Sequence, residues 1–180
     1  EELGLAYKYV LLDPKKGENK TPEYLKLNPT GKVPTLVDGD FVIFESGAIC
    51  EYLAEKHQRF IPKAGSPEYY HCKQWNYFIL TNLEPQALRV FSVDFFMEKN
   101  DVSGAIKKMA LDILPRFLTP LNERLASEVY LCGKDFTVSD VFLITALGYI
   151  RHSNIVSDYA NLTKYIERCS SRSAYKKVFA

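Results

Sequence analysis

The segment from Asn28 to Ser46 reads NPTGKVPTLVDGDFVIFES. It places Asn-Pro, Gly and Val-Pro before one short apolar run, and Asp-Gly between that run and a second one. Asp-Gly between two apolar runs is a strong signal for a hairpin turn. Residues 35–37 and 41–44 are therefore predicted to form an antiparallel pair of strands. The closing Glu-Ser is predicted to open a helix with Ser46 as its N-cap.

The sequence around this segment predicts a small mixed unit. Residues 7–12 (YKYVLL) are β-branched and aromatic and predict a strand. Thr21-Pro22 offers an N-cap followed by proline at the first helical position, which predicts a short helix over residues 22–27. Apolar residues recur at helical spacing over residues 46–57. The expected order is strand, helix, strand, strand, helix.

Helical periods dominate the rest of the chain. Helices are expected over residues 67–97, 103–126, 138–151 and 158–169, with a further short helix in the tail. Pro85 is expected to bend or interrupt the first of them. We therefore predict a first domain over residues 1–58, a linker over residues 59–66 and an all-helical domain over residues 67–180.

Composition excludes several classes of protein. With 47% hydrophobic and 13% aromatic residues in 180, the chain can bury a substantial core. Its net charge is +1, and no block of like charge indicates a nucleic-acid or membrane surface. The apolar window 141–150 is far shorter than the ~20 residues of a membrane helix.

The four cysteines, at positions 50, 72, 132 and 169, are widely spaced and include no C-x-x-C. This spacing argues against a zinc site or a disulfide framework, so no metal and a reducing intracellular setting are expected. In FTVSD, Thr137 precedes Asp140 by three residues, which is a capping-box arrangement at a helix start. Asp140 is interpreted as structural rather than catalytic.

Two blocks of the sequence point to a family. NPTGKVPTLVDGDFVIFESGAICEYL and the later GKDFTVSDVFL resemble, in this order and separation, the glutathione-site block and the helix-capping motif of cytosolic glutathione S-transferases. The resemblance covers almost the whole chain. It implies an α/β plus all-α fold, in which a thioredoxin-like domain, incomplete at its start, precedes an all-helical domain.

The same resemblance implies an activity. A cytoplasmic, homodimeric detoxification enzyme is expected, which conjugates the thiolate of glutathione to a hydrophobic electrophile. Glutathione would be its co-substrate, and no metal, nucleic acid or membrane would take part.

The resemblance implies that the Val33-Pro34 peptide is cis. That geometry turns the Val33 N–H and C=O outward, where a peptide-like ligand can pair with them as an added strand. From the residues alone, a trans proline at a strand start is the alternative.

Glu45 and Ser46 are expected to bind the γ-glutamyl end of glutathione. A serine at a helix N-terminus suits a carboxylate, and the adjacent glutamate can accept hydrogen bonds from an ammonium group. The structural alternatives are a plain N-cap for Ser46 and a first-turn acid for Glu45.

The phi-like branch of the family uses cations and hydrogen-bond donors for the glycyl carboxylate, which implies that role for Lys20 and Lys32. Asn19 stands where that branch often has histidine. For each lysine, a solvated surface position is the alternative. The electrophile is assigned to Arg89, Phe91, Phe95 and Phe96, and a phenylalanine stripe that belongs to the core is the alternative.

The start of the chain, EELGL, resembles the end of the family's first helix. We therefore expect the thiol-activating residue, a serine by the phi-like pattern, to lie upstream of Glu1, and these 180 residues to be a fragment. A purified protein of 20.6 kDa would contradict the fragment. The alternative is a chain that has lost its catalytic loop.

Other functions remain open on the sequence. One is a non-catalytic module like those of elongation factor 1 gamma or stringent starvation protein A. Another is a glutathione-dependent isomerase or reductive dehalogenase of the same fold. The joint presence of Lys32, Val33, Glu45 and Ser46 favours a working glutathione site.

Overall fold

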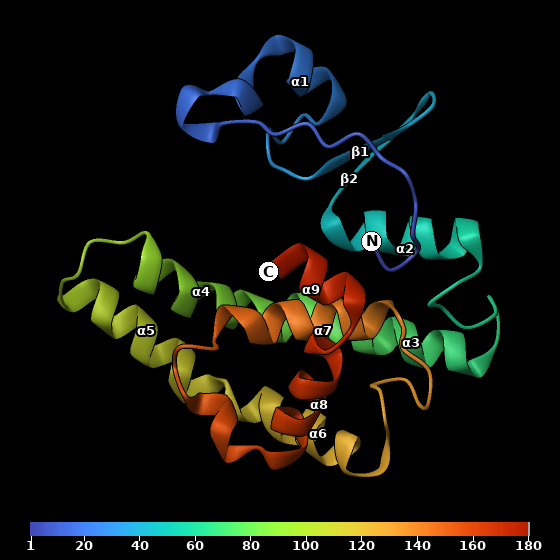
Figure 1. Ribbon diagram of the computed structural model, residues 1–180. Coiled ribbons are helices and arrows are strands. Elements are labelled where there is room, and N and C mark those ends of the chain that lie inside the picture. The colour runs from blue at the N-terminus through green and yellow to red at the C-terminus, as the bar shows by residue number, and fades with distance from the viewer. Residues whose placement is uncertain (180) are drawn as a thin grey trace. The chain divides into compact units, whose positions relative to one another are not determined.

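A computed structural model describes residues 1–179 and divides the chain into two compact units (Figure 1). One unit comprises Glu2–His57, and the other runs from Gln58 onward together with Glu1. The first contains a hairpin with helices and the second contains helices, which confirms the predicted fold class. Residues 59–66, predicted as a linker, belong to the helical unit.

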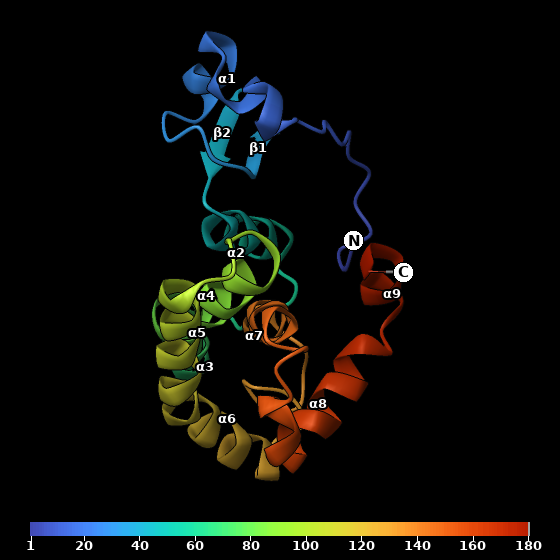
Figure 2. The same cartoon turned by 90° about the vertical axis from the view of Figure 1, so that its left-hand side faces the viewer.

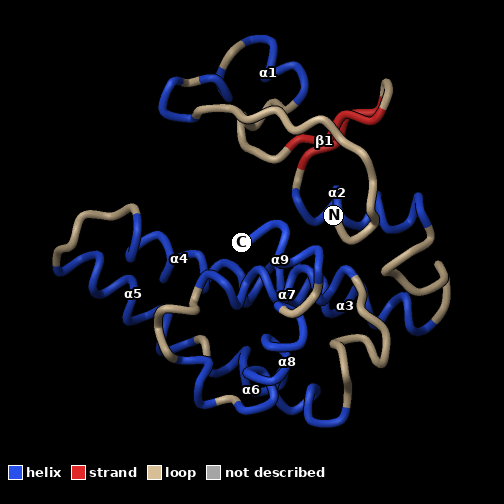
Figure 3. Tube along the Cα trace, viewed as in Figure 1, coloured by secondary structure: helices blue, strands red, loops and turns tan. Residues whose placement is uncertain are grey.

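The unit Glu2–His57 is built around a two-stranded antiparallel sheet (Figure 3). Its elements are the 3-10 helices η1 (Pro14–Lys16) and η2 (Glu18–Lys20), the helices α1 (Pro22–Leu27) and α2 (Ser46–His57), and the strands β1 (Thr35–Asp38) and β2 (Phe41–Phe44). The strand register pairs Thr35 with Phe44 and Asp38 with Phe41, and Gly39 in the turn has a φ of 62°. The predicted hairpin and both predicted helices are confirmed.

Helix α2 is tied to the turn of the hairpin. The Tyr52 hydroxyl donates to Asp38 Oδ2 at 3.0 Å, and Lys56 forms an ion pair with the same carboxylate. The Phe41 ring lies 4.8 Å from the Tyr52 ring, between centroids. These contacts connect the helix after the hairpin to the far end of the strands.

The strand predicted over residues 7–12 is wrong. These residues lie in no regular element, and Tyr7, Tyr9, Val10 and Leu11 are each more than 60% exposed. A strand exists only where its backbone pairs with another strand. Within residues 1–179, the sheet contains β1 and β2 alone. The strand propensity of residues 7–12 is therefore not realised, because their backbone pairs with no strand among the described residues.

The helical unit has α7 at its centre (Figure 2). Residues such as Leu143 and Leu147 of this helix are completely or almost completely buried, and α3, α4 and α8 all contact it. The elements of the unit are α3 (Pro67–Phe78), η3 (Ile79–Leu83), α4 (Glu84–Phe95), α5 (Asp101–Ile113), α6 (Pro115–Ser127), α7 (Val138–Tyr149), η4 (Ile155–Asp158), α8 (Ala160–Ser170) and α9 (Ser173–Phe179).

The interruption predicted at Pro85 is confirmed. Helices α3 and α4 are joined by one π-helical turn, in which the Glu84 N–H donates to the Ile79 carbonyl. Pro85 has no N–H, and its ring would clash with the carbonyl four residues earlier in a regular helix. The wider π turn accommodates the proline without ending the helical path.

The single helix predicted over residues 103–126 is wrong. It is two helices, α5 and α6, which meet at the buried Leu114 because Pro115 cannot donate to the preceding turn. Helix α5 also starts earlier than predicted. The Asn100 N–H donates to Ser103 Oγ and the Ser103 N–H donates to Asn100 Oδ1, both at 3.0 Å, which closes a capping box.

Asp140 organises the start of α7, as its capping role predicts. Its side chain is fully buried and accepts from the Thr137 N–H at 2.8 Å, the Leu131 N–H at 2.8 Å and the Tyr165 hydroxyl at 2.9 Å. Burial raises the pKa of this carboxyl above its usual value, while the same hydrogen bonds act in the opposite direction. One side chain thus connects α7, α8 and the loop before α7.

Replacing Asp140 with alanine should destabilise the helical unit by about 3 kcal/mol, because four buried donors, the Thr137 hydroxyl among them, lose their acceptor together. Urea unfolding followed by the fluorescence of Trp75, the single tryptophan, measures this loss. The exposed Asp135→Ala provides the matched control. Equal unfolding midpoints for the two variants would contradict the structural role of Asp140.

Candidate functional site

The strand register brings two of the predicted site segments together. Because Thr35 pairs with Phe44, Pro34 and Glu45 are the next residues outward on the two strands. Val33-Pro34 and Glu45-Ser46 therefore leave the hairpin at the same end, away from the turn (Figure 3). The Val33-Pro34 peptide bond is cis.

Val33 presents unpaired backbone at this end of the hairpin. The residue is 56% exposed, and within residues 1–179 neither its N–H nor its C=O makes an intramolecular hydrogen bond. Exposed backbone polar groups next to a strand can pair with an extended ligand, as an added strand would. The position thus offers one donor and one acceptor from the main chain.

Glu45, and not Ser46, occupies the N-cap position of α2, which corrects the sequence prediction. The Glu45 carbonyl accepts the first helical hydrogen bond, from the Ile49 N–H at 2.9 Å, and Ser46 is the first residue of the helix. Glu45 has a φ of 72°, a left-handed conformation that costs a non-glycine residue about 1–3 kcal/mol. The turn at Glu45 places the exposed Ser46 side chain at the positive end of the helix dipole.

Asn28 holds the loop that leads to Val33, a role that the sequence analysis missed. It is 1% exposed, and its Nδ2 donates to the Lys32 carbonyl at 2.8 Å while its Oδ1 accepts from the Thr30 N–H at 3.0 Å. The Tyr24 hydroxyl donates to the same Lys32 carbonyl at 2.6 Å. Asparagine often bonds to the backbone two residues later, so Asn-Pro after the helix could have indicated this turn.

Asn19 and Lys20 reach the same loop from η2. Asn19 Nδ2 donates to the Gly31 carbonyl at 2.7 Å, and Lys20 Nζ donates to the Thr30 carbonyl at 3.3 Å. Gly31, which has a φ of 61°, leaves room for the Lys20 side chain, because a Cβ at position 31 would lie 2.5 Å from Lys20 Nζ. Lys32 is exposed on this loop. The three residues predicted for one carboxylate therefore gather around residues 30–32.

Asn19 also carries a buried polar atom that has no hydrogen-bond partner among the described residues. This atom is its side-chain oxygen, Oδ1, whereas its nitrogen is bonded to Gly31. A buried acceptor without a donor costs about 1–3 kcal/mol. The atom can therefore accept a hydrogen bond from a bound molecule or from water.

The residues predicted for the electrophile lie in the helical unit and only partly gather. Phe91 contacts Phe95 and Phe96, with ring centroids 4.8 and 5.6 Å away. The sequence missed Tyr149, whose ring lies 5.3 Å from that of Phe91, because it comes from the end of α7. Arg89 instead donates to Gln86 Oε1 at 2.7 Å.

This aromatic cluster is not a core stripe throughout. Phe95 is 53% exposed and Phe96 is 77% exposed, while Phe91 is half-buried. His152 also contacts Phe95, with ring centroids 5.7 Å apart. Two of the three phenylalanines are thus more than half exposed.

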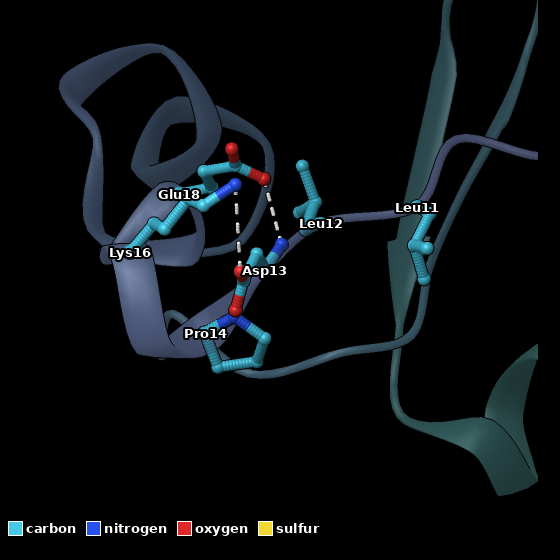
Figure 4. A pocket seen from close by; sticks show the side chains of 6 residues that line it. All are labelled: Leu11, Leu12, Asp13, Pro14, Lys16 and Glu18. Carbon is cyan, nitrogen blue, oxygen red and sulfur yellow. Dashed lines mark hydrogen bonds and ion pairs between the residues drawn. The ribbon is translucent and has the colours of Figure 1, made fainter.

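A hollow of about 420 Å³ lies elsewhere in the unit Glu2–His57 (Figure 4). The Asp13 N–H donates to Glu18 Oε2 at 2.6 Å across one side of it, and Lys16 Nζ lies 3.7 Å from Asp13 Oδ2. Its lining consists of Leu11, Leu12, Asp13, Pro14, Lys16 and Glu18. None of the predicted site residues lines it, so the hairpin end and not this hollow is the candidate site.

Neither a cluster of metal ligands nor a membrane-spanning helix occurs in the part of the chain that the structure describes. No group of three or more His, Cys, Asp and Glu side chains there could hold a metal ion. No helix within residues 1–179 has the length and apolar character needed to cross a bilayer.

Two family models match the chain. Residues 1–55 match the glutathione S-transferase N-terminal domain, and residues 89–168 match the glutathione S-transferase C-terminal domain. Among curated proteins, glutathione S-transferase F10 of Arabidopsis thaliana is 31% identical over 198 residues, covering 99% of this chain and 87% of that protein.

Elongation factor 1-gamma 1 of Oryza sativa subsp. japonica is 35% identical over 167 residues. That match covers 89% of this chain but only 39% of the elongation factor. A solved structure, glutathione transferase URE2P6 from Phanerochaete chrysosporium in complex with oxidized glutathione, superposes with a TM-score of 0.87. It is 29% identical and covers 99% of this chain and 85% of its own. The chain belongs to the glutathione S-transferase family, and its first unit is the thioredoxin-like domain of that fold.

Proposed function

We propose that this protein binds glutathione at the open end of the β1–β2 hairpin and transfers its thiolate to an electrophilic small molecule. The observation that carries the proposal is the strand register, which sets the unpaired Val33 backbone beside the start of α2. Two relatives that match 99% of this chain are glutathione transferases, and one of them was solved with oxidized glutathione.

Each part of glutathione has a matching group in this proposal. The Val33 N–H and C=O pair with the central peptide of the tripeptide. Ser46 and the first N–H groups of α2 bind the γ-glutamyl carboxylate, and Glu45 accepts from the neighbouring ammonium group. Lys20 and Lys32 attract the glycyl carboxylate, and Asn19 contributes a polar side chain beside them.

These residues account for binding, whereas conjugation requires one more group. A free thiol with a pKa near 8.5 is only a few per cent ionised at neutral pH, so a donor must stabilise its thiolate. The electrophile is assigned to the aromatic cluster Phe91, Phe95 and Phe96. Arg89 is a secondary candidate for contacting the electrophile, because its side chain donates a hydrogen bond to Gln86.

A second candidate function is a non-catalytic module, because a rice elongation factor 1-gamma matches 89% of this chain at 35% identity. The two candidates differ in the chemical step. Conjugation of glutathione to an aryl halide, followed by absorbance, should proceed for a transferase and stay at the uncatalysed rate for a module that only assembles with partners. The homodimer and the cytoplasmic location stay predictions.

Replacing Ser46 with alanine should weaken glutathione binding about 10- to 100-fold, because a hydrogen bond to a charged group contributes about 1.5–3 kcal/mol. Isothermal titration calorimetry of glutathione into the full chain measures this. Ser66→Ala is the matched control, since Ser66 caps α3 in the helical unit with the same hydroxyl chemistry. Unchanged affinity for Ser46→Ala would overturn the assignment of α2.

Replacing Asn28 with alanine should also weaken binding, by about 10-fold, although Asn28 itself is buried and does not meet the ligand. The loop over residues 28–32 would lose the hydrogen bonds that fix it, and ordering it would then cost part of the binding energy. The same titration measures the affinity, with the exposed Lys26→Ala as the control. An affinity equal to that of the control would contradict the positioning role.

A further inference from the structure

Two cysteines of the helical unit form a contact pair. Cys72 lies on α3 and is completely buried, and Cys132 lies in the tight turn between Tyr130 and Gly133 and is half-buried. Their sulfurs share one partner, Ser139 Oγ, at 3.1 Å from Cys72 Sγ and 3.2 Å from Cys132 Sγ.

The Ser139 hydroxyl, which contacts both sulfurs, donates its proton to a third residue. Ser139 Oγ lies 2.5 Å from Asn76 Oδ1, the shortest of its contacts, and a serine has a single hydroxyl proton. The hydroxyl therefore donates to Asn76 and accepts from the thiols. The pair is thus held together in the reduced protein by one buried oxygen.

Cys132 also reaches a cavity. A hollow of about 270 Å³ is lined by Glu68, His71, Gln74, Trp75, Arg124 and Cys132. Cys72 does not line this hollow and is completely buried. The charged and titratable groups that face Cys132 across this hollow are Glu68 and His71 from α3 and Arg124 from α6. A small reagent can therefore meet one sulfur while the second stays behind it.

The surroundings act in opposite directions on the two sulfurs of this pair. The neighbouring Cys132 lowers the pKa of Cys72 to about 7, whereas the neighbouring Cys72 and burial raise the pKa of Cys132. Burial instead raises the pKa of Cys50 to about 11 and that of Cys169 to about 12. Thiolate, not thiol, is the nucleophile. The pair therefore contains one sulfur, that of Cys72, that ionises more easily than Cys50 or Cys169.

We propose that Cys132 and Cys72 form a dithiol site that a small hydroperoxide entering the Cys132 cavity oxidises to a disulfide. The Cys132 sulfur attacks one peroxide oxygen, the O–O bond breaks, and the departing hydroxide takes the Cys132 thiol proton and leaves as water, which gives Cys132 sulfenic acid. Cys72 Sγ then attacks Cys132 Sγ, the S–O bond breaks, and a second water leaves. Two thiols lose two electrons in total, and one hydrogen peroxide becomes two waters.

The disulfide would join α3 to the turn that precedes α7. It would close a long loop that contains α4, α5 and α6, and cross-links of long loops constrain the unfolded chain most. The oxidised protein should melt roughly 5–10 °C higher than the reduced protein. This inference does not rest on glutathione binding, because all its residues lie in the helical unit.

The test treats the full reduced chain with hydrogen peroxide and maps the products by mass spectrometry without reduction. A cross-linked pair of peptides that carry Cys72 and Cys132 is expected before any change at Cys50 or Cys169. Its rate of formation should rise with pH, because thiolate is the reactive form of cysteine. Cys72→Ser should stop at the sulfenic acid on Cys132, which a sulfenic-acid trapping reagent detects.

Cys50→Ser is the matched control, because Cys50 is half-buried like Cys132, and it should retain the cross-link at the wild-type rate. The mass-spectrometric map of the wild-type protein does not depend on any variant. The proposal can therefore be tested even if Cys72→Ser misfolds. Oxidation of Cys50 or Cys169 ahead of the pair would overturn the proposal, and so would a pair that stays reduced or forms no cross-link.

Discussion

Backbone N–H and C=O groups that are buried on folding need hydrogen-bond partners. In two loops, where no helix or strand supplies these partners, one buried polar side chain supplies them. Asp140 accepts from the Thr137 and Leu131 N–H groups ahead of α7. Asn28 does the same for the loop ahead of β1, donating to the Lys32 carbonyl and accepting from the Thr30 N–H. The helical unit depends on the first side chain and the candidate site depends on the second.

The candidate site lies where backbone N–H and C=O groups lack a hydrogen-bond partner within residues 1–179. Val33 keeps a free N–H and C=O beside the hairpin, and α2 begins at Ser46 with the unbonded N–H groups of every helix start. A peptide with a carboxylate at its end would satisfy both. The same structure that fixes the loop through Asn28 therefore leaves the donors and acceptors that the proposed glutathione site would use.

Membership of the family does not by itself decide between catalysis and assembly. This chain matches a plant glutathione transferase along 87% of that protein, and it also matches a shorter share of an elongation factor subunit. The fold supports both uses, so function has to be read from the site. The groups at the hairpin end favour ligand binding, and the thiol pair beside Ser139 adds a second chemistry to the helical unit.

Local chemistry in the sequence determined much of this protein. Asp-Gly specified the hairpin, Thr21-Pro22 and Thr137 with Asp140 specified helix starts, and Pro85 specified an interruption. Each depends on neighbours within about five residues, so the sequence contains the whole cause. Local pattern also indicated a helix start at Glu45-Ser46, although Glu45, in a left-handed conformation, and not Ser46 is the N-cap.

Only the tertiary structure decided features that depend on distant partners. Residues 7–12 have strand propensity but pair with no strand in the described chain. Tyr149 meets Phe91 from another helix, and Asn28, which reads as a helix end, holds the loop of the site. Cys72 and Cys132, apparently unrelated in a sequence without C-x-x-C, meet on one serine. Strand pairing and side-chain packing bring together residues that are far apart in the chain. A local sequence pattern does not indicate which distant residues will meet.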